Sequence, residues 1–180
     1  MKVIRTPLDG FLAIQPDVYG DGRGFFLETY QEARYQQEGI TDKFVQDNHS
    51  RSSKGVLRGM HFQVKRPQAQ IVTVMSGKIL DVVVDLRKKS QTFGQWHSVE
   101  LGENSEARQV YMAPGFAHGF LVLSDFADLH YKVSGMYDPT DEGGLFWNDE
   151  SIGIDWPMLN NRFYISDRDK NYPSLSELKL

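Results

Sequence analysis

The 180-residue sequence has no cysteine, which excludes disulfide bonds, thiolate metal ligands and a cysteine nucleophile. It has no run of roughly 20 apolar residues, the length that a membrane-spanning helix needs. Residues 1–10 lack the apolar core of a signal peptide, so we expect a cytoplasmic protein without membrane contact. The net charge is −4 and no basic stripe is present, which argues against a nucleic-acid partner.

Sequence signatures for common cofactors and metals are also missing. No Gly-x-Gly-x-x-Gly stretch opens a helix and no Gly-x-x-x-x-Gly-Lys loop is present, so neither nicotinamide nor ATP binding is indicated. His61 has Met60 and Gln63 where a second histidine would be needed, and His118 is a single late histidine. Two imidazoles without a suitably spaced carboxylate make a poor zinc or iron site. We therefore expect no cofactor and no metal.

Short apolar runs separated by turn residues dominate what is present. They predict strands at 57–64, 71–75, 79–86, 95–101, 109–112, 119–123 and 129–133. Short strands at such regular spacing are typical of a sandwich or barrel. A helix is predicted at 31–38, ended by Gly39, and a weaker helical end at 174–179. No repeat or linker divides the chain, so residues 1–180 are expected to form one all-β jelly-roll domain with a few short helices.

The predicted strand 79–86 has two different faces. Its even positions are all apolar, whereas its odd positions alternate apolar and acidic residues, the acids being Asp81 and Asp85. This pattern indicates either core against solvent or core against a polar pocket, and the sequence leaves both interpretations open. The basic run 87–89 that follows is expected to be a solvated turn between strands.

With metals and cofactors set aside, the chemistry left to this sequence is acid–base chemistry by histidine, tyrosine and aspartate, with arginines for anionic groups. A histidine on a strand is more often structural than catalytic, but His61 has Arg58 close by. In an unbroken strand these two side chains point to opposite faces. Gly59 between them is a suitable bulge site, which would bring both into one cavity.

Ordered motifs along nearly the whole chain resemble the dTDP-4-dehydrorhamnose 3,5-epimerase family of cupin-type nucleotide-sugar epimerases. The motifs are Asp21–Glu28, Gln46–Asn48, Leu57–Gln63, Val83–Arg87, Pro114–Phe120, Tyr131-Lys132, Tyr137, Trp147–Asp149, Ile154–Pro157 and Ser166–Asp169. Each is weak alone, but the ordered set is specific. The resemblance implies a cupin jelly-roll β-sandwich. It also implies cofactor-independent epimerisation at C3, C5 or both carbons of a nucleotide-linked 4-keto-6-deoxyhexose, with dTDP as the expected nucleotide.

The resemblance also implies a role for individual residues. His61 would remove the proton beside the C4 ketone, Asp169 would orient His61, and Tyr131 would return a proton to the opposite face of the ring. Tyr137 would stack on the nucleobase. The residues implied in substrate binding are Arg23, Phe26, Glu28, Gln46, Asp47, Asn48, Arg58, Gln70, His118, Tyr137, Glu142 and Arg168. The family is dimeric with exchanged N-terminal strands, so a homodimer is expected in which Arg23 acts across the interface.

Gln70 departs from the family pattern, which has a lysine at this position near the ketone. A neutral donor stabilises an enolate less than a charged one, so inversion at a single carbon, or a differently substituted keto-sugar, stays open. A nucleotide-sugar ketoisomerase is another alternative, although it would need a second catalytic histidine near His61. A sugar-binding cupin without activity would have no use for the set of His61, Asp169 and Tyr131.

Overall fold

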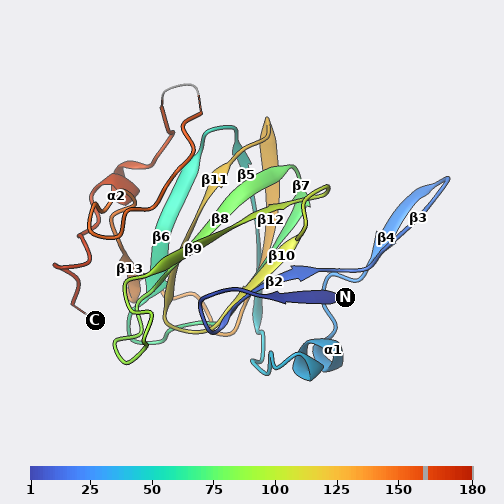
Figure 1. Ribbon diagram of the computed structural model, residues 1–180, viewed down its shortest axis with the longest axis horizontal. Helices are drawn as coiled ribbons and strands as arrows, with labels where there is room; N and C mark the ends of the chain where they lie inside the picture. Colours follow the sequence, from blue (N-terminus) through green and yellow to red (C-terminus); the bar gives the residue numbers. More distant parts are fainter. Residues whose placement is uncertain (160–161, 180) are drawn as a thin grey trace.

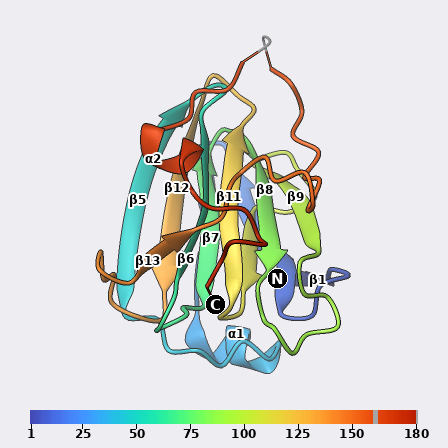
Figure 2. The same ribbon diagram turned by 90° about the vertical axis from the view of Figure 1, so that its left-hand side faces the viewer.

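The computed structural model describes residues 1–159 and 162–179, which fold into two facing β-sheets with two short helices (Figures 1 and 2). The elements are β1 (Lys2–Arg5), β2 (Phe11–Gln15), β3 (Val18–Asp21), β4 (Gly24–Leu27), α1 (Glu32–Gln37), β5 (Gln46–Ser53), β6 (Leu57–Gln63), β7 (Gln70–Ser76), β8 (Lys78–Asp85), β9 (Trp96–Gly102), β10 (Gln109–Met112), β11 (Phe116–Val122), β12 (Phe126–Val133), β13 (Glu142–Gly144) and α2 (Asp167–Lys170).

The strand order makes the fold a jelly roll. The six-stranded sheet has the order β1-β2-β10-β7-β12-β5, and the five-stranded sheet has the order β13-β6-β11-β8-β9. Pairs of strands distant in sequence are neighbours in both sheets, and every named pair is antiparallel. The prediction of an all-β sandwich of the cupin type is confirmed. No helix of the described ranges is long and apolar enough to cross a membrane.

The seven predicted strands are all present, with ends that differ by up to three residues. The predicted helix is α1, and Gly39 follows it with a φ of +89°, a left-handed conformation that suits glycine. The helical end predicted at 174–179 was wrong. The Glu177 carboxylate accepts hydrogen bonds from the backbone N–H and the hydroxyl of Ser174, which closes a single turn. No helix follows this turn up to residue 179.

Three apolar clusters hold the sandwich together. The first lies between the two sheets and includes Phe11, Val83 and Leu129. The second lies on the outer face of the five-stranded sheet, where the C-terminal segment covers it with Trp156. The third lies on the outer face of the six-stranded sheet, where α1 inserts Tyr35. Both ends of the chain therefore contribute a covering layer to a sheet.

Strand β8 separates two apolar layers rather than core and solvent. Val82 and Val84 pack under the C-terminal segment, whereas the opposite face, with Asp81 and Val83, points into the space between the sheets. Neither interpretation of this strand holds as stated, because the face with Asp81 is buried between the sheets, where Asp81 pairs with His118 behind the lining of the cavity described below.

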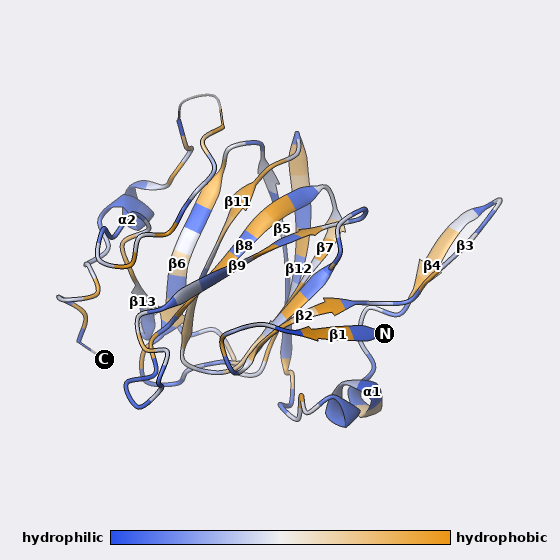
Figure 3. Ribbon diagram, viewed as in Figure 1, coloured by the Kyte–Doolittle hydropathy of each residue, from blue (hydrophilic) through white to orange (hydrophobic). Residues whose placement is uncertain are grey.

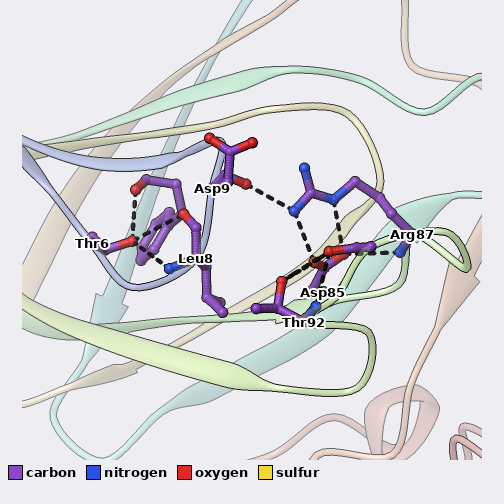
Figure 4. Close-up of polar contacts among 8 residues, drawn as sticks. Thr6, Leu8, Asp9, Asp85, Arg87 and Thr92 are labelled. Atoms are coloured by element: carbon purple, nitrogen blue, oxygen red, sulfur yellow. Dashed lines mark hydrogen bonds and ion pairs between the residues drawn. The ribbon is translucent and has the colours of Figure 1, made fainter.

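Asp85, at the end of β8, has a structural role in the following turn (Figure 4). Its buried carboxylate accepts hydrogen bonds from the Arg87 side chain and from the hydroxyls of Ser90 and Thr92, at 2.6–2.8 Å. Burial acts to raise the pKa of Asp85, but these donors together lower it to about 2. The basic run 87–89 does form a turn, as expected, although Arg87 is paired with Asp85 rather than simply solvated.

The hairpin β3–β4 projects away from the body, and its strand β4 is coloured as hydrophobic in Figure 3. Tyr19, Phe25 and Phe26 are each more than half exposed on it. Exposed aromatic side chains on a projecting arm make it a candidate interaction surface.

Candidate active site

One wall of the cavity between the sheets is shaped by an irregularity in β6. The ladder between β6 and β11 shifts register between His118 and Phe120, opposite Gly59, which has a φ of +128°. A Cβ atom at Gly59 would lie 2.5 Å from the Cα of Gly119, so the two backbones can approach this closely only as glycines. The predicted bulge is therefore present, and Arg58 and His61 line the same cavity.

The cavity has a volume of about 360 Å³ and draws its walls from both sheets. The five-stranded sheet supplies Arg58, His61 and His118, and the six-stranded sheet supplies Gln70 and Tyr131. The other lining residues are Asn48, His49, Ser50, Phe62, Gln63, Gln68, Gly119, Phe120, Val133, Tyr137 and Glu142. Arg58 is the one lysine or arginine in this lining, as far as the structure describes the chain.

His61 forms a hydrogen-bonded pair with a buried carboxylate. Its Nε2 atom lies 2.9 Å from Oδ1 of Asp169, which is only 2% exposed and is carried by α2. The second carboxylate oxygen accepts the Gly59 N–H at 3.1 Å. Burial acts to raise the pKa of Asp169, but the hydrogen bonds from His61 and Gly59 outweigh it and hold the pKa below its usual range. Asp169 is thus an anion that fixes one nitrogen of His61.

Tyr131 reaches the cavity from the facing sheet. Its hydroxyl lies 3.1 Å from the Ser50 hydroxyl on the neighbouring strand β5. Burial raises the pKa of Tyr131 to about 12, against smaller lowering contributions from Ser50 and the charge of Arg58. A phenol with so high a pKa keeps its proton at neutral pH. An acid and a base therefore approach the cavity from opposite walls.

A second histidine–carboxylate pair lies beside the first. His118 Nε2 is 2.8 Å from Oδ2 of Asp81, and both side chains are buried. The other oxygen of this carboxylate, Oδ1, has no hydrogen-bond partner among the described residues. His118 is also the direct ladder partner of His61. Sequence reasoning noted Asp81 as a polar residue on an alternating strand, and that alternation was the available signal, but the pairing with His118 was missed.

A chain of polar contacts surrounds the mouth of the cavity. Gln46 donates to Asn48 at 2.8 Å and accepts the backbone N–H of Tyr137 at 3.0 Å. The Tyr137 hydroxyl and Arg168 both donate to one oxygen of Glu142, at 2.7 and 2.8 Å. The ring of Tyr137 is half exposed, so it is free to contact a ligand at the mouth.

Four of the predicted site residues neither line this cavity nor surround its mouth. Asp47 points to the outer face of β5, where it pairs with Lys132 at 2.7 Å, because strand alternation turns it away from Asn48. Arg23 and Phe26 lie on the projecting hairpin, and Glu28 follows it and pairs with Arg34. The remaining predicted residues line the cavity, surround its mouth or, for Asp169, support His61 from behind.

Comparison with known proteins identifies the family. A family model described as dTDP-4-dehydrorhamnose 3,5-epimerase matches residues 5–177. The chain belongs to this epimerase family. It is 47% identical to the dTDP-4-dehydrorhamnose 3,5-epimerase of Methanothermobacter thermautotrophicus, over 98% of this chain and 95% of that protein. It is 44% identical to the Escherichia coli K12 enzyme of that name, over 99% of this chain and 96% of that protein.

Solved structures of the epimerase family agree with the fold. A dTDP-6-deoxy-D-glucose-3,5-epimerase from Legionella pneumophila, in complex with dTDP-4-keto-L-rhamnose, superposes with a TM-score of 0.95 at 44% identity, covering 99% of this chain and 94% of that one. A 3'-monoepimerase from Streptomyces bikiniensis, in complex with dTDP-quinovose, gives a TM-score of 0.88 at 32% identity, covering 96% and 87%. Members of the family fold alike whether they are described as 3,5-epimerases or as a monoepimerase.

Metal binding finds little support in the residues of this epimerase-family chain. Across residues 1–159 and 162–179, no group of three or more histidines and carboxylates lies close enough together to hold a metal ion. Each cavity histidine is instead paired with one aspartate. The expectation of a metal-free and cofactor-free site stays a prediction, which a chelator assay can test.

Proposed function

We propose that the chain epimerises a dTDP-linked 4-keto-6-deoxyhexose at C3 and C5, the reaction that its family name describes. The observation that carries the proposal is the pair of acid–base groups on opposite walls of one cavity, with His61 and Asp169 on one side and Tyr131 on the other. A carbon beside a ketone is inverted when a proton leaves one face and another arrives at the opposite face. Two facing walls supply that arrangement.

His61 is the base in this proposal. Because Asp169 holds Nε2, the other nitrogen, Nδ1, is the one left to take the substrate proton. The carboxylate stabilises the imidazolium that then forms. The electrons of the broken C–H bond move onto the C4 oxygen as an enolate, for which Gln70 is a candidate donor in the lining. Tyr131 gives its proton to the opposite face of the carbon.

The mouth of the cavity suits a nucleoside diphosphate. Tyr137 offers a half-exposed ring for the base, and Arg58 and Arg168 lie at the cavity and its mouth for the phosphates. Glu142 holds Arg168 in the free protein, so a bound phosphate would compete with this carboxylate for the guanidinium.

The proposal includes a homodimer with exchanged N-terminal strands. Two observations support it: the aromatic hairpin β3–β4 projects from the body, and β5 is an edge strand of the six-stranded sheet. An arm from a second copy beside β5 would bring Arg23, Phe26 and Glu28 toward the partner's cavity. Sedimentation at a mass of two 20.6 kDa chains is the expected result. A cytoplasmic location and a single domain over residues 1–180 stay predictions.

A nucleotide-sugar ketoisomerase is the second candidate, and one observation favours it. The sequence counted against this activity because Met60 and Gln63 flank His61, but His118 from β11 is the ladder partner of His61 and lines the same cavity.

One experiment tests both candidates. The protein is incubated with dTDP-4-keto-6-deoxyglucose in deuterated water and followed by NMR at C3 and C5. Epimerisation places deuterium at both carbons with inversion and leaves the ketone at C4. Movement of the ketone to C3 would replace the epimerase proposal by the ketoisomerase, and absence of any exchange would refute both.

A further inference from the structure

Tyr172 contacts the imidazole of His61, and nothing in the proposed chemistry accounts for it. The ring centroids are 5.8 Å apart and the rings lie at 72°, an edge-to-face arrangement. Tyr172 follows the short helix α2, which carries Asp169 three residues earlier. One segment of the chain therefore contacts His61 twice, with a carboxylate at Nε2 and with an aromatic ring.

The Tyr172 ring packs against a glycine. Gly144 on β13 is the direct ladder partner of His61, and a Cβ atom placed on it would lie 2.3 Å from Tyr172 ring atoms. The ring thus lies directly on the backbone beside His61, in space that any other residue at 144 would occupy. Pro173, the residue after Tyr172, is fixed as well, because its carbonyl accepts a hydrogen bond from the Phe146 N–H at 2.8 Å. The backbone of β13 under the ring and the hydrogen bond to Pro173 therefore both hold Tyr172 against His61.

A histidine ring needs more than one contact to be fixed. Rotation about its χ2 torsion is broad, because this torsion joins a tetrahedral and a planar atom. The single hydrogen bond from Nε2 to Asp169 leaves the ring free to tilt about that bond. An aromatic ring against the imidazole removes this freedom, and the direction of Nδ1 is then defined.

We infer that Tyr172 is a positioning residue for His61, whose ring holds the imidazole so that Nδ1 points at the substrate carbon while Nε2 stays on Asp169. The inference rests on the proposed function, since it assigns His61 as the base. The ring makes the contact in the structure, so phenylalanine should replace tyrosine here and alanine should not. The hydroxyl lies near the charges of Arg168 and Glu142 at the mouth and serves no purpose in this assignment.

Kinetics of deuterium exchange provide the first test. Misplacing a reactive group by about 1 Å costs about 100-fold, so Tyr172→Ala should lower kcat by about 10- to 100-fold while KM stays near the wild-type value. Tyr172→Phe should restore most of kcat. Tyr164→Ala is the control, because it removes another tyrosine of the C-terminal segment, one that is half exposed and has no ring contact with His61, and it should behave as wild type. A folded Tyr172→Ala with wild-type kcat, or a Phe variant as slow as the Ala variant, would overturn the assignment.

A second test does not depend on turnover. In the free full-length protein, nuclear Overhauser effects should connect the Tyr172 ring protons to the His61 ring protons. Gly144→Ala should abolish them, because its methyl group would displace the tyrosine ring, and it should reduce kcat as Tyr172→Ala does. If the wild type exchanges no deuterium, the proposed function fails while this contact can still be seen. If exchange is fast and the contact is absent, the positioning role alone is refuted.

Discussion

Replacing Asp169 by asparagine tests the central pair of the site, because it changes charge and leaves size nearly unchanged. The carboxylate has two acceptor oxygens, one for His61 at 2.9 Å and one for the Gly59 N–H at 3.1 Å. An amide has one oxygen and one NH₂ group, so it can serve only one of these donors. The buried side chain must adopt one of two orientations, and each predicts a different loss of activity.

If the amide oxygen faces His61, the tautomer is kept and only the charge is lost. A hydrogen bond to a charged group contributes about 1.5–3 kcal/mol, which corresponds to about 10- to 150-fold in kcat. If the oxygen faces Gly59 instead, the NH₂ group faces Nε2 of His61 and forces the proton onto Nδ1. The nitrogen that should accept the substrate proton is then blocked, and the loss should approach the roughly 10⁴-fold known for a wrong histidine tautomer.

The assay is deuterium entry at C3 and C5 from deuterated water, with thermal unfolding to show that the variant is folded. His61→Asn is the reference, since it removes the base itself and should abolish exchange. Asp169→Asn should lie between this reference and the wild type, at one of the two levels above. Wild-type exchange in a folded Asp169→Asn protein would show that the buried carboxylate does not support the base, and the assignment of the pair would be abandoned.

Four further predictions follow from other parts of the structure. Tyr131→Phe should keep deuterium exchange but lose inversion, because exchange needs only the base; loss of exchange by NMR would make Tyr131 part of proton removal instead. Gln70→Lys should speed deuterium labelling at whichever of C3 and C5 is slower in the wild type. The gain should be less than about 100-fold, since removal of a whole oxyanion donor costs about 100- to 1000-fold in kcat. Slower labelling at both carbons would indicate that Gln70 recognises a different sugar. Asp85→Ala should lower the free energy of unfolding by about 3–5 kcal/mol in urea titrations. The pKa of Asp85 is about 2 in the folded protein against an ordinary value of 3.8, so its contribution to folding stability is present above pH ~4 and lost as pH falls through about 2. An Asp85→Ala protein whose stability depends on acid pH as the wild type does would contradict this. Mixing inactive Arg23→Ala and His61→Ala proteins should restore about a quarter of wild-type activity, because half of the dimers are hybrids with one intact site each; no recovery after verified subunit exchange would argue against a shared site.

Periodicity and motif order in the sequence were enough to predict the sandwich and most of the cavity wall. The strands that carry His61, Gln70, His118 and Tyr131 alternate between apolar and polar residues or contain apolar runs, and each was predicted. Strand β5 was missed because its eight residues include no apolar one. It is an edge strand between the cavity and the outer surface, so neither of its faces needs an apolar side chain to pack against a core.

Other features could not be predicted because they depend on segments that meet only in the fold. The pairing of His118 with Asp81 joins two neighbouring strands, and strand register is not written in either sequence segment alone. The contact between Tyr172 and His61 depends on Gly144, a residue that looks like an ordinary turn glycine in the sequence. The orientation of Asp47 away from the cavity follows from alternation on a strand that was not recognised.

The projecting hairpin β3–β4 has a consequence for how the protein responds to dilution. If Arg23 completes the cavity of a second copy, each molecule alone has an incomplete site. Specific activity then depends on total protein by mass action and falls as the sample is diluted through the dissociation constant of the pair. The gradual loss of activity after a concentrated stock is diluted would report the rate at which the arms separate. The lag before full turnover after a dilute sample is concentrated would report the rate at which they re-engage.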